Sequence, residues 1–390
     1  MKIALLGCHI NSTNLGCQAL TYSLVQMLEN ISKAKNTQFE YVLFEYAPSE
    51  ETTQEFCNRV HVDQSRIMAY RIAPVYRWRS YIKHFRRNTD MLRRIKECDV
   101  AIDLTAGDSF SDIYGRQRFI SLTRIKRMVE LLGVPLILGP QTYGPFQHSG
   151  NYRTARRVME NAKAIIARDA VSAKLASEMV RHQVETTTDL AFQLPYRKNT
   201  LEHDRSNIGI NISGLLVRDH IEKGIEDTVR LSVDYDQYIL SLVKSLCNDG
   251  YHIYLVPHVD EDYKASKDIH DLFPETELVA PFTNPIDAKS FISALDCFIG
   301  ARMHATIAAF SSGVAVIPTA YSRKFDDLFS TIGYNRTIDL RTETTDSAVE
   351  KTLKYVKERD LISAEISALF PRLDDYTKLT ESFFIHAMGL

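Results

Sequence analysis

An arginine and a histidine lie two residues apart in Gly300-Ala-Arg-Met-His304, between an apolar run that ends at Ile299 and a segment of helical period. Arg302 can bind a carboxylate or phosphate through paired hydrogen bonds, and a helix N-terminus favours negative charge at the same place. His304 is the side chain best suited to exchange a proton near neutral pH. The structural alternative is that Arg302 pairs with a core carboxylate and His304 caps a helix.

Other candidate ligands also follow predicted strands. Arg168 ends a strand in the first half of the chain and Arg302 ends one in the second half. Two arginines on facing sides of a cleft suit a substrate with two anionic groups. Lys324, in Tyr321-Ser-Arg-Lys324, is expected near Arg302, and His258 ends a further strand. Lone strand-end arginines are more often surface ion-pair partners, so neither arginine is specific by itself.

Three loops of the first half follow predicted strands and are rich in small or polar residues. In Thr105–Asp112, the carboxylates of Asp108 and Asp112 suit the orientation of sugar hydroxyls or a general base, and helix N-capping is the alternative. Gly139–Pro145 holds two Gly-Pro pairs, which indicate a rigid loop that lines a site or shapes the fold. Gly7–Gly16 lacks both the Gly-x-Gly-x-x-Gly and the P-loop patterns, so no nucleotide cofactor is predicted, although its N–H groups suit an anion.

Short apolar runs alternate with segments of helical period along the whole chain, which predicts parallel sheets covered on both faces by helices. The expected strands are Lys2–Leu6, Glu40–Phe44, Val100–Leu104, Val134–Leu138, Ala164–Ala167, Ile208–Ile212, His252–Val256, Cys297–Ile299 and Val314–Ile317. The expected helices include Cys17–Glu29, Gln117–Leu132, Tyr152–Asn161, Tyr235–Cys247, Ala288–Leu295, His304–Phe310 and Lys324–Thr331.

A length of 390 residues favours two domains, and the polar stretch Tyr196–Ser206 is the expected linker. We therefore predict an α/β protein with two Rossmann-like domains, residues 1–196 and 207–373, that face each other across a cleft. Ligands are expected at the carboxyl ends of the strands. The last segment, 374–390, has helical period and is expected to pack back on one of the domains.

Composition excludes several classes of protein. The net charge of −2 gives no electrostatic case for nucleic acid. The N-terminal apolar run is too short for a signal peptide, and no run approaches the ~18 apolar residues of a membrane span. The six cysteines are scattered without a Cys-x-x-Cys pair, so we expect reduced thiols in the cytoplasm and no structural zinc or other metal site.

The stretch Arg71–Lys96 departs from this neutral balance, with nine Lys and Arg residues against the single acid Asp90. A helix that begins at Pro74 would place its aromatic and aliphatic residues roughly on one face. A basic amphipathic helix suits the anionic inner face of the cell membrane or a lipid-phosphate substrate. The alternative is a solvated helix with an ordinary core face.

Over residues 1–335 the sequence resembles the polysaccharide pyruvyltransferase family. The similarity is strongest in Gly300–His304 with Tyr321-x-x-Lys324, in Ala167-Arg168-Asp169-x-x-Ser172 and in Gly139-Pro-Gln-x-x-Gly-Pro145. The Asn14-x-Gly16 turn also matches, although Cys17 stands where the family usually has aspartate. The Gly-rich turn after the Asp103 strand is reduced to Ala106-Gly107-Asp108.

The resemblance implies a GT-B-like fold and transfer of the pyruvyl unit of phosphoenolpyruvate to two hydroxyls of a sugar, which gives a cyclic ketal and free phosphate in the synthesis of cell-surface polysaccharide. It makes Arg168 and Arg302 ligands of the donor's carboxylate and phosphate, with Asn14 and Lys324 beside them. His304 is then the acid that protonates the enol carbon, and the donor is a substrate, so no cofactor is required.

The acceptor side is less specified. Asp108 or Asp112 is the candidate base for the attacking hydroxyl, and Gln141, Tyr143 and His258 are candidate acceptor ligands. The acceptor's carrier stays open, and a lipid diphosphate would suit the stretch Arg71–Lys96. Two other functions remain open: a nucleotide-sugar glycosyltransferase of the same fold, and a non-catalytic glycan-binding member of the family.

Overall fold

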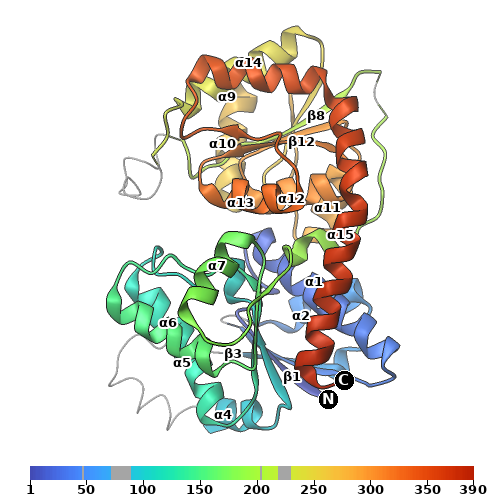
Figure 1. The fold of residues 1–390 in the computed structure, drawn as a ribbon. Coiled ribbons are helices and arrows are strands. Elements are labelled where there is room, and N and C mark those ends of the chain that lie inside the picture. The colour runs from blue at the N-terminus through green and yellow to red at the C-terminus, as the bar shows by residue number, and fades with distance from the viewer. Residues whose placement is uncertain (46–47, 72–88, 203, 218–229) are drawn as a thin grey trace. The chain divides into compact units, whose positions relative to one another are not determined.

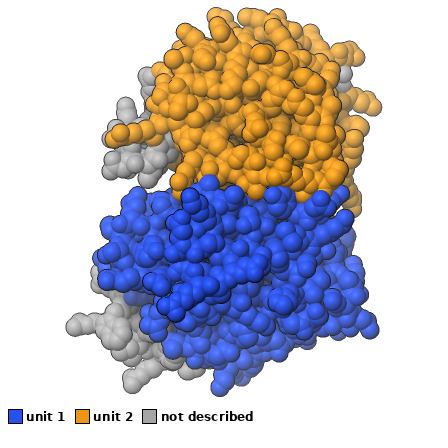
Figure 2. All heavy atoms as spheres, viewed as in Figure 1, with its two compact units in different colours: residues 1–12, 20–190, 374–390 blue, residues 13–19, 191–373 orange. Residues whose placement is uncertain are grey.

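The structure is a computed structural model that describes residues 1–45, 48–71, 89–202, 204–217 and 230–390. It divides into two compact units (Figure 2). Unit 1 consists of residues 1–12, 20–190 and 374–390, and unit 2 consists of residues 13–19 and 191–373. The predicted linker, 196–206, therefore falls within unit 2. The predicted cleft between two domains stays a prediction.

Unit 1 contains a seven-stranded, wholly parallel sheet in the order β3-β2-β1-β4-β5-β6-β7. The strands are β1 (Lys2–Leu6), β2 (Glu40–Glu45), β3 (Ile67–Arg71), β4 (Val100–Asp103), β5 (Leu136–Gln141), β6 (Ala164–Ala167) and β7 (Glu185–Thr186). The order of the first six strands is that of a Rossmann sheet. The strand order reverses between β1 and β4, which pair in parallel with Leu5 opposite Ile102.

Helices cover both faces of this sheet (Figure 1). Ala4 and Leu6 of β1 lie in a buried cluster with residues of α4, α5, α6 and α7, and the alternating residues Ile3 and Leu5 are buried on the opposite face. The helices of unit 1 are α1 (Leu15–Ala34, whose first five residues belong to unit 2), α2 (Glu50–Val60), α4 (Thr89–Lys96), α5 (Arg116–Leu131), α6 (Ser149–Asn161) and α7 (Ala170–Met179). The turns η1 (Gln64–Arg66), η2 (Thr105–Gly107) and η3 (Leu190–Gln193) are 3₁₀-helical.

Unit 2 contains a second parallel sheet in the order β10-β9-β8-β11-β12-β13, which is the same Rossmann order counted from β8. The strands are β8 (Asn207–Asn211), β9 (His252–Leu255), β10 (Glu277–Leu278), β11 (Cys297–Gly300), β12 (Ala315–Ala320) and β13 (Ile338–Asp339). The helices are α9 (Tyr235–Asn248), α10 (Asp260–Leu272), α11 (Pro285–Ile292), α12 (Met303–Ser311), α13 (Arg323–Ile332) and α14 (Thr345–Lys357).

The C-terminal helix is longer than the sequence predicts. α15 runs without a break from Arg359 to Met388 and passes through Pro371, so its first half belongs to unit 2 and its second half to unit 1. The segment 374–390, predicted to be helical, is thus the second half of a longer helix, and it clusters with unit 1. None of the described helices offers an apolar stretch long enough to span a bilayer.

Most of the basic stretch 71–96, including the helix predicted to begin at Pro74, lies outside the described residues. Its described part contains α4. There Arg93 and Arg94 both pair with Asp90, at 2.6 and 3.2 Å. Two of the nine basic side chains are thus engaged in ion pairs within their own helix.

Candidate active site

The carboxyl edge of the unit 2 sheet carries three of the predicted site residues. His258 follows β9, Arg302 follows β11 and Lys324 follows β12. In the sheet, β9, β8, β11 and β12 are successive neighbours. A Rossmann sheet binds its ligands at this edge, at the point where the strand order reverses, which here is between β8 and β11.

Arg302 is fixed by a buried carboxylate from α10. Its Nε and Nη2 donate to the carboxylate of Asp262 at 2.8 to 3.3 Å, and its backbone N–H donates to Oδ1 of Asn211 at 3.0 Å. Asp262 is fully buried and also accepts from the Asn211 amide and the Gly214 N–H. Burial acts to lower the pKa of Arg302, but the charge and hydrogen bonds of Asp262 outweigh it and raise the pKa. The structural alternative for Arg302, a core carboxylate partner, is thus what the structure contains.

The same guanidinium still presents one edge to a ligand. The Arg302 side chain is 16% exposed, and within the described part of the chain its Nη1 donates no hydrogen bond. Arg302 is also the N-cap of α12, and its side chain makes no capping hydrogen bond. Lys324 lies in the first turn of the neighbouring helix α13, whose N-cap Ser322 likewise makes none. Two helix N-termini and two cations therefore follow neighbouring strands, and both features favour anions.

His304 lies in the first turn of α12, and its ring lies against the backbone of Gly16. A Cβ atom built on Gly16 would be 2.6 Å from Cγ of His304 and closer still to Nδ1. Gly16 belongs to the first turn of α1, where its N–H donates to Oδ1 of Asn14 at 2.9 Å. Residues 13–19 cluster with unit 2. The Asn14-x-Gly16 turn and the Arg302-x-His304 pair, nearly 300 residues apart in the sequence, thus meet within one unit.

His258 is a buried histidine whose two ring nitrogens have no hydrogen-bond partner among the described residues. Its backbone N–H donates to Asp262 at 3.3 Å. Burial and the proximity of His304 lower the pKa of His258 to about 3, so its ring is neutral near pH 7. A neutral imidazole offers one donor and one acceptor, which suits a hydroxyl and excludes His258 as the acid.

In unit 1, Arg168 follows β6 and so also lies at the carboxyl edge of its sheet, but it is enclosed. Its Nη1 donates to Asp189 at 2.6 Å and its Nε donates to Thr142 at 2.8 Å, while Nη2 is buried without a partner among the described residues. Only 1% of the Arg168 side chain is exposed. Burial acts to lower its pKa, but Asp189, Asp108 and Asp169 together raise it. The buried, unpartnered Nη2 marks a position where a bound anion or water would be stabilised.

The turn after β4 has an unusual backbone. Thr105, Ala106 and Gly107 all adopt positive φ angles, of 44°, 52° and 84°. Positive φ is uncommon for residues other than glycine and costs energy for a β-branched side chain. Gly7, which follows β1, has φ of 60° and leaves no room for a Cβ beside the Thr105 backbone. The two loops therefore meet closely where the strand order of unit 1 reverses.

The two candidate bases have different surroundings. Asp112 is 5% exposed and accepts from the N–H groups of Gln147 and His148 and from the Asn151 amide, at 2.8 to 3.0 Å. Burial acts to raise the pKa of Asp112, but these donors lower it overall. Asp108 is half-buried and accepts from the Tyr114 hydroxyl at 2.6 Å. Asp112 therefore anchors the following loop, whereas Asp108 is the less buried of the two carboxylates.

The loop predicted over Gly139–Pro145 begins inside a strand, because β5 continues to Gln141. The pairing of β5 with β6 shifts register between Leu138 and Gln141, around Pro140, which has no N–H to donate. The Gln141 amide donates to the Asp103 carbonyl at 3.0 Å, and its buried Oε1 has no partner among the described residues. Tyr143 is buried, with its hydroxyl 3.1 Å from the Ile166 carbonyl. Tyr143 thus shapes the loop from inside, whereas Gln141 keeps an acceptor for a ligand.

Several residues of these sites were not predicted. Asp262 and Asp189 position the two arginines, and Asn211 ties Arg302 to β8. Another is Glu45, the last residue of β2, which is 1% exposed and accepts from the N–H groups of Ile10 and Asn11. Nδ1 of His9 lies 3.7 Å from Glu45, so a histidine–carboxylate pair follows β1 and β2. The position of Asn211 and Glu45 at strand ends was the available signal.

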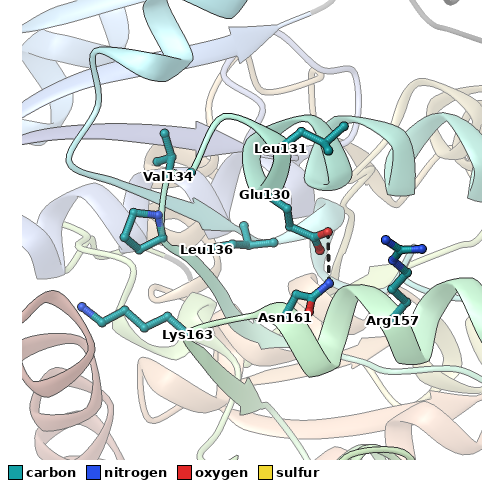
Figure 3. Close-up of a pocket in the computed structure, with 9 residues that line it drawn as sticks. Glu130, Leu131, Val134, Leu136, Arg157, Asn161 and Lys163 are labelled. Atoms are coloured by element: carbon teal, nitrogen blue, oxygen red, sulfur yellow. Dashed lines mark hydrogen bonds between the residues drawn. The ribbon is translucent and has the colours of Figure 1, made fainter.

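A surface pocket of about 530 Å³ lies elsewhere in unit 1. Its lining comes from the ends of α5 and α6 and the start of β5, so it lies at the amino edge of the sheet, away from the site (Figure 3). Within it, Glu130 accepts from Asn161 at 3.5 Å, and Arg157 and Lys163 lie nearby (Figure 3). None of the predicted site residues lines it.

Among the residues that the structure describes, no three His, Cys, Asp or Glu side chains are grouped as a metal site would require. The charged groups at both carboxyl edges are instead arginines, a lysine and carboxylates that hold them. Such an edge suits organic anions, which guanidinium groups and helix N-termini bind directly.

The sequence model of polysaccharide pyruvyl transferase matches residues 14–323, which include both arginines and His304. The chain belongs to this family. A polysaccharide pyruvyl transferase is a transferase of polysaccharide biosynthesis, and the family implies a sugar acceptor. A search of curated proteins finds no match.

Solved structures with a similar fold have very different sequences. The UDP-GlcNAc 2-epimerase of Neisseria meningitidis, bound to UDP-GlcNAc, aligns over 100% of this chain and 99% of its own, with TM-score 0.59 and 10% identity. A putative UDP-N-acetylglucosamine 2-epimerase of Listeria monocytogenes aligns over 93% and 90%, with TM-score 0.62 and 9% identity. UGT89C1 of Arabidopsis thaliana, complexed with UDP, aligns over 100% and 99%, with TM-score 0.59 and 8% identity. At this identity the likeness shows the fold alone, which is GT-B-like with two Rossmann-type sheets.

Proposed function

We propose that this pyruvyl transferase uses phosphoenolpyruvate as donor and forms a cyclic pyruvate ketal on two hydroxyls of a sugar. The observation that carries the proposal is the arrangement at the start of α12. There Arg302, oriented by Asp262, and the proton-exchanging side chain of His304 share one helix N-terminus with Lys324 nearby along the sheet edge. A compact donor with a phosphate, a carboxylate and a basic carbon matches these groups.

Donor binding uses charge. Nη1 of Arg302, the amino end of α12 and Lys324 bind the phosphate or the carboxylate, and Asn14 contributes from the turn beside His304. In unit 1, Arg168, whose Nη2 is buried without a described partner, offers a second arginine for an anionic group. Because Asp262 occupies the Nε and Nη2 edge of Arg302, the anion approaches from the remaining edge.

The chemical step begins with protonation. His304 gives a proton to the methylene carbon of the enol, which becomes a methyl group, and the adjacent carbon becomes an oxocarbenium-like centre. A sugar hydroxyl adds to that carbon while a general base accepts its proton. The bond between that carbon and the phosphate oxygen breaks, and the departing phosphate takes the proton that the base accepted. The second hydroxyl then closes the ring, and its proton returns His304 to its acidic form. The arginines and Lys324 stabilise the phosphate as it leaves.

Each unit offers a neutral side chain that suits an acceptor hydroxyl. Oε1 of Gln141 is a buried acceptor, and the neutral ring of His258 offers a donor and an acceptor. Both suit sugar hydroxyls, which need paired hydrogen bonds and no charge. An acceptor linked to a lipid diphosphate would bring the polybasic stretch 71–96 to an anionic membrane surface, and sedimentation with anionic vesicles at low salt tests that contact.

The test measures donor identity directly. Wild-type protein is incubated with phosphoenolpyruvate and a panel of pyranosides that carry neighbouring free hydroxyls, and released phosphate and the product mass are recorded. The proposal predicts phosphate release together with a product heavier by one pyruvyl unit. A parallel thermal-shift comparison uses phosphoenolpyruvate and UDP-sugars. Stabilisation by UDP-sugars alone would favour a nucleotide-sugar transferase, and stabilisation by phosphoenolpyruvate without phosphate release would favour a non-catalytic protein.

A further inference from the structure

The first turn of α1 forms a wall against the ring of His304. A Cβ atom on Gly16 would lie 2.6 Å from Cγ of His304 and 3.0 Å from its Cβ, and nearer still to Nδ1. Atoms that are not bonded to a Cβ essentially never lie within 3.0 Å of it, because the van der Waals surfaces would overlap. The ring can occupy its present position only because residue 16 has no side chain.

Backbone geometry does not explain the glycine. Gly16 lies inside α1 and does not have the positive φ angle that favours glycine at other positions of this chain. In a helix, alanine is more favourable than glycine. The sequence therefore gives up helix stability at this position, and the gain is the space that the ring of His304 occupies.

The wall is itself held firmly. The side chain of Asn14 accepts from the Gly16 N–H at 2.9 Å, and the Asn14 carbonyl accepts from Cys17 at 3.1 Å and from Gln18 at 3.4 Å. On the other side, Arg302 immediately precedes the helix that carries His304 and is tied to both Asp262 and Asn211. The partly buried imidazole thus lies against the capped start of α1.

We propose that Gly16 is a positioning residue: its bare backbone sets the plane of the His304 ring and so the direction in which His304 delivers its proton. This inference rests on the proposed function, in which His304 is the acid. Gly16 itself contacts neither donor nor acceptor in this proposal. Its effect passes entirely through the orientation of His304.

The test combines Gly16→Ala with a matched control, Gly150→Ala. Gly150 is also the second residue of its helix, α6, and a Cβ built there meets nothing within 4 Å. Both substitutions introduce the same methyl group at the same helical position. We expect Gly150→Ala to keep wild-type kcat. We expect Gly16→Ala to lose at least tenfold in kcat while the KM for phosphoenolpyruvate changes less than threefold. A wild-type kcat in folded Gly16→Ala would overturn the proposal.

A stability cycle keeps the contact testable apart from catalysis. Gly16→Ala is expected to lower Tm when His304 is present and to leave it unchanged or raise it in the His304→Ala background, because the overlap with the ring is then gone. An equal Tm change in both backgrounds would overturn the proposal. If wild-type protein releases no phosphate from phosphoenolpyruvate, the proposed function fails, whereas the Tm cycle still reports on the contact.

Discussion

The carboxyl edges of the two sheets each hold an arginine, but they expose it to different extents. Each places an arginine at a strand end against a buried aspartate, Arg168 with Asp189 at 2.6 Å in unit 1 and Arg302 with Asp262 at 2.8 Å in unit 2. The Arg168 side chain is 1% exposed, and the Arg302 side chain is 16% exposed. Unit 1 encloses Arg168. Unit 2 leaves Arg302 partly exposed, beside a helix N-terminus and a histidine.

The difference indicates a division of labour. A carboxylate that binds one edge of an arginine fixes the orientation of the guanidinium group. The other edge is then already oriented when a ligand binds. The Arg302 side chain keeps part of its surface in contact with solvent. At Arg168 the remaining nitrogen, Nη2, is buried. This arginine can therefore bind only a group that lies inside unit 1.

The largest expected effect concerns the acid of unit 2. His304→Ala should lower kcat by about 10²- to 10⁴-fold, the usual contribution of a positioned proton donor, with the fold intact. The measurement is phosphate release from phosphoenolpyruvate in the presence of acceptor. His386→Ala, at an exposed position in α15, is the matched control and should keep wild-type kcat. Wild-type turnover in folded His304→Ala would contradict the division of labour.

Removing the carboxylate charge that pairs with each arginine should lower the free energy of unfolding by different amounts in the two units. Asp189→Asn leaves the enclosed Arg168 charge uncompensated and should cost about 3 to 5 kcal/mol of unfolding free energy. Asp262→Asn should cost less, about 1 to 3 kcal/mol, because Arg302 retains contact with water. Urea unfolding followed by circular dichroism gives both values. A larger loss for Asp262→Asn would reverse the comparison.

A smaller effect follows from His258. Burial lowers its pKa to about 3 in the folded protein, against 6.5 for an ordinary histidine. The unfolded chain therefore binds more protons between these values, so this histidine makes stability fall as pH drops from 6.5 towards 3. The slope is at most about 1.4 kcal/mol per pH unit. Measuring the free energy of unfolding against pH for wild-type protein and for His258→Gln isolates this contribution. The wild-type curve should be the steeper of the two. Parallel curves would show that His258 is not held neutral by the fold.

The central strands follow from the sequence because a buried parallel strand is a continuous apolar run. β1 and β6 have the predicted bounds, Lys2–Leu6 and Ala164–Ala167. The outer strands were missed. β7 and β13, for example, are only two residues long and give no periodic signal, so neighbouring strands define them. The division of α1 and α15 between the units was also unpredictable, since helical period carries no information about which unit each turn contacts.

For the site, the sequence placed chemistry at strand ends but did not identify what holds it. Arg302 and Asp262 are 40 residues apart, and Arg168 and Asp189 are 21 apart, so only the tertiary fold joins them. The positive φ of Thr105 could not be predicted from the sequence, because threonine rarely adopts this conformation. Gly16 was expected in a turn, yet it lies within α1, where the ring of His304 accounts for it.

The most direct measurement is turnover by the wild-type protein in D₂O with phosphoenolpyruvate and a sugar acceptor. If His304 protonates the methylene carbon, the ketal methyl group must contain about one solvent deuterium per molecule, visible by mass spectrometry and by NMR. A pyruvyl ketal whose methyl group contains no solvent deuterium, or sugar transfer from a nucleotide sugar with no pyruvyl product, would contradict the account.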